Sequence, residues 1–255
     1  MSLSITLRNV DLKYLTIEGE TGALQGLNFE VAAEEFVGIV GPSGCGKSTL
    51  LSLVAGLLRP TNGEVLVGGS PVTGPSPRVG YMLQHDYLFE WRTIKKNVFI
   101  GLEVLGVKDP AMYDRALKLL ASSGLQGFED HYPYQLSGGM RQRAALVRTL
   151  ATEPEVLLLD EPFSALDYQT RLYLEDEVYK TLRAKKKTVI LVTHDLAEAI
   201  AMCNRVVVMS HRPGRVKAEH YIELSAECGT PFQCRQAPEF RRYFRQIWEE
   251  LEVNV

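Results

Sequence analysis

A glycine-rich segment that ends in lysine could hold the phosphates of a nucleotide. It fits the pattern GxxxxGK[ST] and lies between an apolar run at 36–40 and a leucine-rich stretch at 48–58. Glycines let the backbone curve so that its N–H groups face phosphate oxygens, and a helix start adds partial positive charge. We expect Lys47 to contact the β- and γ-phosphates of ATP and the Ser48 hydroxyl to bind Mg²⁺. The expected ATP-binding residues of this loop are Gly41, Pro42, Ser43, Gly44, Cys45, Gly46, Lys47, Ser48 and Thr49.

Two carboxylates follow a second apolar run, at 156–159. Asp160 and Glu161 stand where this predicted strand ends. Ligands of open α/β sheets bind outside the carboxyl ends of the strands. We expect Asp160 to enter the Mg²⁺ shell and Glu161 to polarise the water that attacks the γ-phosphate. A solvated acidic turn is the alternative, but together with the phosphate loop the pair predicts nucleotide hydrolysis.

Buried strands that alternate with helices must position these groups. This alternation predicts an α/β domain with a mainly parallel sheet, and a helical stretch from about 85 to 155 interrupts it. Asp195 and Glu198 have the spacing of a helix-capping box. The expected strands are 3–10, 27–31, 36–40, 64–67, 156–159, 188–193 and 206–210, and the clearest expected helices are 48–58, 111–122, 139–152, 171–185, 195–202 and 240–251.

Composition narrows the class of partners and the compartment. The 255 residues carry a net charge of −3, which gives no bulk attraction for nucleic acid. We find neither an apolar run near the roughly 18 residues that span a bilayer nor a secretory signal, so we expect a cytoplasmic location. The cysteines form no CxxC pair, which favours reduced thiols over a zinc site. They are Cys45, Cys203, Cys228 and Cys234.

Further motifs occur in a fixed order around these two. Gln84 follows Tyr-Met-Leu, LSGGMRQR spans 136–143, Ser-Ala-Leu-Asp spans 164–167, and His194 lies between Thr and Asp. In this order they resemble the Q-loop, signature, D-loop and switch histidine of ATP-binding cassette (ABC) ATPases, over nearly the whole chain. The resemblance implies a P-loop NTPase with a parallel core sheet, an N-terminal antiparallel β-subdomain and an inserted helical subdomain. The implied nucleotide-binding domain is 1–225, with its core at about 1–84 and 156–225 and its helical subdomain at about 85–155, followed by a helical tail at 226–255.

The resemblance also assigns roles within the site. Gln84 is expected to act in catalysis and to bind Mg²⁺, and His194 to contact the γ-phosphate and support the attacking water, with Glu161 as the base. Tyr14 is expected to stack on adenine; an unrelated surface or core tyrosine is the alternative. Two such domains are expected to pair head to tail. Ser137, Gly138, Gly139 and Gln142 of one would then contact the ATP held by Lys47 of the other.

One set of motifs without a fused membrane segment is typical of a separate transporter ATPase subunit. GMRQR at 139–143 and MSHRPGR at 209–215 resemble the nitrate, sulfonate and taurine importers, although Glu90 and the stretch 229–238 depart from them. The implied partners are a second ATP-binding subunit, an integral membrane permease and a solute-binding protein, at the cytoplasmic face of the membrane. A soluble non-transport ABC ATPase and an exporter subunit remain alternatives.

A cluster of large apolar residues follows Gln84. Tyr87, Leu88, Phe89 and Trp91 could form the surface that docks the permease, because exposed apolar clusters are usually partner sites. The alternative is that they pack the core of the helical region.

Overall fold

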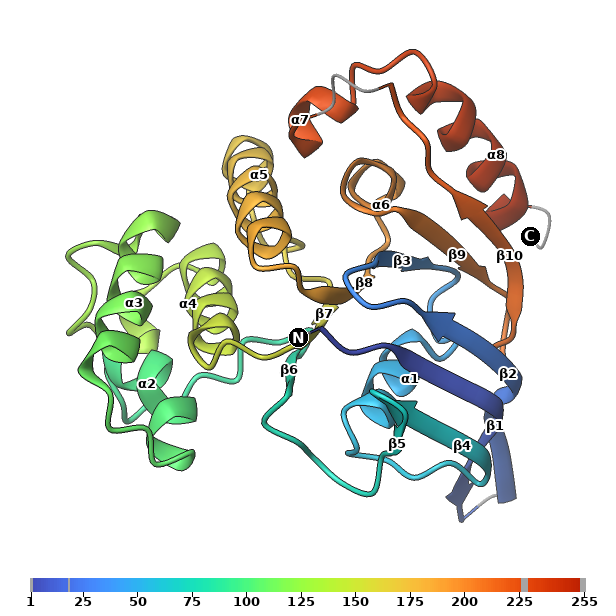
Figure 1. Ribbon diagram of the computed structural model, residues 1–255, viewed down its shortest axis with the longest axis horizontal. Coiled ribbons are helices and arrows are strands. Elements are labelled where there is room, and N and C mark those ends of the chain that lie inside the picture. Colours follow the sequence, from blue (N-terminus) through green and yellow to red (C-terminus); the bar gives the residue numbers. More distant parts are fainter. Residues whose placement is uncertain (1, 18, 226–228, 253–255) are drawn as a thin grey trace.

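Two β-sheets form the framework of the computed structural model, which describes residues 2–17, 19–225 and 229–252 (Figure 1). The smaller sheet is antiparallel, and its strand order is β2 (Gly19–Val31), β1 (Ile5–Thr16), β4 (Asn62–Val67), β5 (Ser70–Pro71). The larger sheet has the order β10 (Val216–Tyr221), β9 (Arg205–Met209), β3 (Phe36–Val40), β8 (Thr188–Val192), β7 (Val156–Asp160), β6 (Val79–Met82). Its strands are parallel except for β10, which pairs antiparallel with β9.

Both faces of the larger sheet are buried, which explains why its central strands are continuously apolar. Phe36 and Val40 of β3 enter one core, whereas Val37 and Ile39 enter the other. Helix α1 (Lys47–Val54) packs in the second core, between the two sheets. The other face is covered by α5 (Tyr168–Ala184) and α6 (Leu196–Met202).

The remaining helices lie in two groups. On one side of the molecule are α2 (Ile94–Val104), α3 (Pro110–Leu120), a short π-helix η1 (Ala121–Leu125), a 3₁₀ turn η2 (Pro133–Gln135) and α4 (Gly138–Ala151). Near α5 and α6 lie α7 (Pro231–Cys234) and α8 (Phe240–Glu252). No described helix is long and apolar enough to cross a membrane.

The α/β class and mainly parallel sheet predicted from the sequence are confirmed, and the differences are local. Helix α1 ends at Val54 rather than near 58, because Gly56 adopts φ +75° and a Cβ there would lie 2.3 Å from the Gly74 carbonyl oxygen. Strands β6 and β10 were missed because they are the two edge strands of the larger sheet and are only partly buried. The exact subdomain boundaries near 84, 155 and 225 stay a prediction.

The predicted capping box forms by half. The Asp195 carboxylate accepts from the N–H groups of Ala197 and Glu198, at 2.8 and 3.2 Å. Glu198 does not return a bond to the N–H of Asp195; that N–H donates to the Thr193 hydroxyl instead. Burial of Glu198 raises the pKa of its carboxyl well above the ordinary value, and the hydrogen bond that it accepts from the same hydroxyl at 3.1 Å opposes this shift.

Candidate functional site

The phosphate loop is a tight turn between β3 and α1. Gly44 and Gly46 adopt φ values of +73° and +105°, the left-handed region that glycine enters at little cost. A Cβ on Gly46 would lie 2.7 Å from Cδ2 of Leu24, so this position requires glycine for space as well. The Cys45 side chain is buried, which raises the pKa of its thiol. Of this loop, Pro42 and Cys45 do not line the pocket described below.

Lys47 lies across the loop at the start of α1. Its Nζ donates to the carbonyl oxygens of Gly41 and Pro42, at 2.8 and 2.9 Å. An ammonium group has three donors, and these two bonds fix where it stands. The arrangement holds a positive charge beside backbone N–H groups at a helix start, which is a binding site for phosphate.

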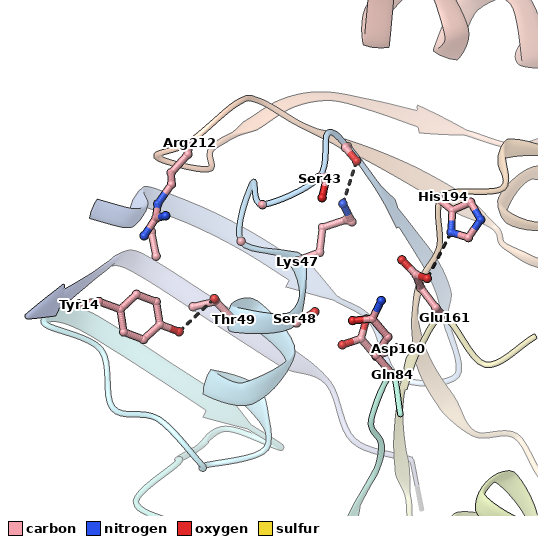
Figure 2. Close-up of a pocket in the computed structure, with 14 residues that line it drawn as sticks. Tyr14, Ser43, Lys47, Ser48, Thr49, Gln84, Asp160, Glu161, His194 and Arg212 are labelled. Carbon is pink, nitrogen blue, oxygen red and sulfur yellow. Dashed lines mark hydrogen bonds and ion pairs between the residues drawn. The ribbon is translucent and has the colours of Figure 1, made fainter. Parts of the chain in front are cut away.

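The carboxyl end of β7 brings two acidic side chains to the same place. Asp160 is buried, and this burial raises the pKa of its carboxyl, opposed by a hydrogen bond from Ser48 and by the charge of Lys47. Glu161 has a left-handed φ of +50°, unusual for a residue with a side chain, and its N–H donates to the Val192 carbonyl at 2.8 Å. This turn directs Glu161 away from the strand and into the pocket (Figure 2).

His194 comes to Glu161 from the neighbouring strand. Because β7 and β8 pair in parallel with Asp160 opposite Val192, the residues after each strand end side by side. The Nδ1 of His194 lies 3.3 Å from Oε2 of Glu161, and the imidazole is 65% exposed. A carboxylate that is oriented by an imidazole and faces the phosphate loop can accept a proton from water.

All of these groups surround one pocket of about 440 Å³ (Figure 2). Tyr14 lies at its far end, with its hydroxyl 3.2 Å from that of Thr49, and Gln84 enters from the chain after β6. The pocket thus joins most of the predicted nucleotide site of this chain. Its lining is Tyr14, Ala23, Gly41, Ser43, Gly44, Gly46, Lys47, Ser48, Thr49, Gln84, Asp160, Glu161, His194 and Arg212.

The site suits Mg²⁺ bound together with phosphate. The Ser48 hydroxyl and the Asp160 carboxylate line the same pocket, and both are hard oxygen ligands of the kind this ion prefers. Mg²⁺ typically uses one or two protein oxygens and completes its shell with phosphate and water. Within the described part of the chain, no group of three or more His, Cys, Asp or Glu could hold a metal by itself.

Arg212 was not predicted as a site residue. It lies in the loop between β9 and β10, and its side chain enters the pocket at the Tyr14 end (Figure 2). In the sequence this loop was noted only because MSHRPGR at 209–215 resembles the importer sequences. No spacing rule connects residue 212 to residue 14, because their shared position at this end of the pocket depends on how the two sheets pack.

The signature segment stands apart from the pocket of its own chain. Ser137 is the N-cap of α4, and its Oγ accepts from the Met140 N–H at 3.3 Å. Ser137 and Gly138 are exposed, and neither they nor Gly139 line the pocket. The helix start therefore offers its N–H groups to an anion outside this subunit's own site.

The structure places Gln142 differently from the expectation that it contacts a partner's ATP. It is 4% exposed, and Nε2 donates to the Glu161 carbonyl at 2.9 Å while Oε1 accepts from the Ala165 N–H at 2.9 Å. Both ends of its amide are thus engaged within the same chain. Gln142 instead bonds to the backbone that carries the Glu161 carboxylate.

We expect Gln142→Leu to lower the free energy of unfolding by about 1–3 kcal/mol, because it removes the hydrogen bonds that this buried amide makes with Glu161, Ser164 and Ala165. Urea denaturation followed by circular dichroism measures this change. Gln169→Leu, an exposed position on α5, is the control and should stay within about 0.5 kcal/mol of the wild type. Equal unfolding midpoints for both variants would contradict the positioning role of Gln142.

Comparisons with known proteins agree with this geometry. The model of the ABC transporter family matches residues 24–164. The chain is 47% identical over 238 residues to the ABC transporter ATP-binding protein YtlC of Bacillus subtilis, covering 93% of this chain and 92% of that protein. It is 40% identical over 251 residues to the nitrate import ATP-binding protein NrtD of Synechocystis, covering 97% and 94%. A dimeric structure of the ATP-binding cassette MJ0796 bound to ADP and Pi superimposes with a TM-score of 0.78 at 32% identity, covering 86% of this chain and 99% of that one.

Proposed function

Because the chain belongs to the ABC transporter family of ATP-binding proteins, we propose that it powers a multi-subunit membrane importer for a small anion such as nitrate, a sulfonate or taurine. The chain is an ABC ATPase that binds and hydrolyses ATP. The observation that carries the catalytic part is the Glu161–His194 pair, which faces Lys47 across the pocket.

Each polar group of the pocket has a task in hydrolysis. Lys47 and the loop N–H groups bind the β- and γ-phosphates. Glu161 accepts the proton of the attacking water. His194 orients the Glu161 carboxylate and contacts the γ-phosphate. Ser48, Asp160 and Gln84 would hold Mg²⁺, which would supply positive charge to neutralise the phosphates. Tyr14 provides the aromatic face for the base.

The exposed signature segment supports pairing with a second subunit. Ser137, Gly138 and Gly139 lie at a helix start outside their own pocket, so they are available to the nucleotide of another copy or of a homologous subunit. The similar cassette MJ0796 was solved as a dimer. A head-to-tail dimer would close each pocket with the signature of the opposite subunit.

The loop after Gln84 supports docking of a permease at the cytoplasmic face of the membrane. Tyr87 and Trp91 are 60% and 76% exposed, whereas Leu88 is buried in the core and Phe89 is half-buried. Asn97, fully buried, holds the loop by accepting from the Phe89 N–H at 2.7 Å and donating to the carbonyl of the same residue at 3.1 Å. Leu88 thus anchors the loop in the core, and Tyr87 and Trp91 form an exposed aromatic surface.

This docking loop is also bonded to α4, the helix that begins at the signature. Asp86 pairs with Nε of Arg141 at 3.1 Å, and Nη1 of Arg141 donates to the Leu136 carbonyl at 2.9 Å. Arg148 donates to the carbonyls of Asp86 and Tyr87, at 2.6 and 2.8 Å. Movement of a permease at this loop would therefore reach the residue that precedes Ser137.

We expect Tyr87→Ala combined with Trp91→Ala to abolish most transport while the ATPase activity of the isolated subunit stays near the wild-type value. Removing two exposed aromatic anchors typically costs more than 2 kcal/mol of binding, at least about 30-fold in affinity. The double variant Tyr173→Ala, Phe232→Ala is the control, because both rings are exposed on α5 and α7. Transport that survives loss of Tyr87 and Trp91 would remove the docking assignment.

Reconstitution tests the importer proposal directly. The chain would be expressed with candidate permease and solute-binding subunits, and ATP-driven uptake of nitrate, sulfonates and taurine measured in vesicles, with Lys47→Ala as the inactive control. We expect uptake that requires the solute-binding protein. Outward transport would identify an exporter subunit, and failure to associate with any permease would favour a non-transport ABC ATPase.

A further inference from the structure

We propose that Arg212 forms the second wall of the nucleoside end of the pocket and binds the purine base together with Tyr14. The inference rests on ATP being the substrate and adds a contact that the phosphate and catalytic motifs do not supply. Figure 2 shows the Arg212 side chain directed into the same end of the pocket as the Tyr14 ring, away from Glu161 and His194.

Hydrogen bonds fasten the loop that carries Arg212 to strand β2. The Gly214 N–H donates to the Ala23 carbonyl at 2.8 Å, and the Gln25 N–H donates to the Gly214 carbonyl at 3.1 Å. Nε of Arg212 itself donates to the Gly22 carbonyl at 3.0 Å. Arg212 is therefore held by its own bond to β2 and by the two backbone bonds that Gly214, two residues later, makes to the same strand.

The same loop presses against the phosphate loop. A Cβ on Gly214 would lie 2.0 Å from the Cys45 carbonyl oxygen, so the two loops meet with no room for a side chain. Arg212 is two residues away from this contact. Packing of the two loops thus sets the position of the Arg212 backbone relative to the phosphate loop, and a residue that binds a ligand needs such support.

Tyr14 reaches the pocket from the neighbouring strand. In the β1–β2 ladder Tyr14 is opposite Thr21 and Lys13 is opposite Gly22, the residue that anchors Arg212. Tyr14 is partly exposed, and its hydroxyl is near Thr49 of the phosphate loop. One strand pair therefore determines where the phenol ring and the guanidinium stand relative to each other.

The guanidinium has the chemistry for this task. It is planar, permanently charged and stacks on aromatic faces, and it carries donors beyond the one used at Gly22. Within the described residues the bond to Gly22 is the one hydrogen bond found for this side chain. Its remaining N–H groups are available for base nitrogen or ribose oxygen acceptors.

Arg215 provides a matched control in the same loop. It is also an exposed arginine, but its Nη2 bonds to the Gln25 side chain at 2.5 Å and it does not line the pocket. Removing Arg215 tests general effects of charge loss and loop disturbance. Removing Arg212 tests the nucleoside contact.

The test compares binding of MgATP with binding of inorganic tripolyphosphate and Mg²⁺, which lacks a base. We expect Arg212→Ala to weaken ATP binding by about 5- to 30-fold, the range of a partly to fully desolvated cation–π contact, while tripolyphosphate affinity stays within about 2-fold. Arg212→Lys keeps the charge but loses the planar guanidinium, so its ATP affinity should lie between those of the wild type and Arg212→Ala. Arg215→Ala should match the wild type.

Two outcomes would overturn the inference: unchanged ATP affinity in both Arg212 variants, or an equal loss for ATP and tripolyphosphate, which would place Arg212 on the phosphates. Thermal unfolding establishes that each variant is folded. If Arg212→Ala does not fold, the same comparison is made with Arg212→Lys. A wild-type chain that binds no ATP would instead contradict the proposed function. Wild-type binding that Arg212→Ala leaves intact contradicts this inference alone.

Discussion

Glu161→Gln is expected to lower the kcat of ATP hydrolysis by roughly 10²–10⁴-fold, the usual contribution of a general base. The amide has nearly the shape of the carboxylate, so the turn after β7 keeps its form. It cannot accept the proton of the attacking water. ATP should still bind, because Lys47 and the phosphate loop are unchanged.

The variant should therefore accumulate with ATP bound, and two subunits should remain closed around it. Steady-state phosphate release gives kcat, and size-exclusion chromatography with light scattering detects the ATP-dependent dimer. Glu64→Gln removes a carboxylate that pairs with Arg8 on the surface and should behave like the wild type. A kcat for Glu161→Gln close to that of the wild type would show that another group is the base.

Ser137→Arg, introduced into the Glu161→Gln background, is expected to abolish the ATP-dependent dimer while ATP affinity of the separate subunits is retained. Ser137 is exposed and outside its own pocket, so a bulky cation there leaves that pocket intact. In the head-to-tail pair it would occupy the space of the γ-phosphate held by the other subunit. Equilibrium dialysis and light scattering separate the two effects.

The substitution also removes the N-cap of α4, which by itself costs about 1 kcal/mol. Asp109→Arg is the matched control, because Asp109 is the exposed N-cap of α3 in the same group of helices. It should leave the dimer intact. If Ser137→Arg weakens ATP binding of the separate subunit as much as it weakens the dimer, the signature acts within its own chain.

Local patterns in the sequence were enough to predict the phosphate loop and the acidic end of β7. These features can be recognised from residues adjacent in the chain. They are the turn at Gly44 and Gly46, the Lys47 ammonium and the Asp160 carboxylate. The joint role of His194 and Glu161 was implied by the family resemblance, and the two lie close together because β7 and β8 are parallel neighbours that end at the same edge.

The burial of Gln142 and Leu88 and the position of Arg212 depend on tertiary packing, which the sequence patterns did not predict. Gln142 looks like a polar residue of an exposed motif, yet the turn of α4 directs it inward, where it binds the Glu161 carbonyl. Leu88 and Trp91 are both large and apolar, but Leu88 joins the core that contains Ile94 and Val98 of α2, whereas Trp91 is 76% exposed. Arg212 enters the Tyr14 end of the pocket from a loop of the other sheet, an arrangement that no sequence spacing predicts.

Arg141 and Arg148 of α4 both bond to Asp86 of the docking loop, one to its carboxylate and the other to its carbonyl oxygen. The two arginines are seven residues apart, which is about 10 Å at the rise of an α-helix. Contacts that start this far apart on the helix and meet at one loop residue form a triangle, which resists sliding of the loop along α4. In the proposed transporter, a displacement imposed at Tyr87 and Trp91 would therefore move α4 as a whole and carry its first turn, where Ser137 lies, toward or away from the opposite subunit.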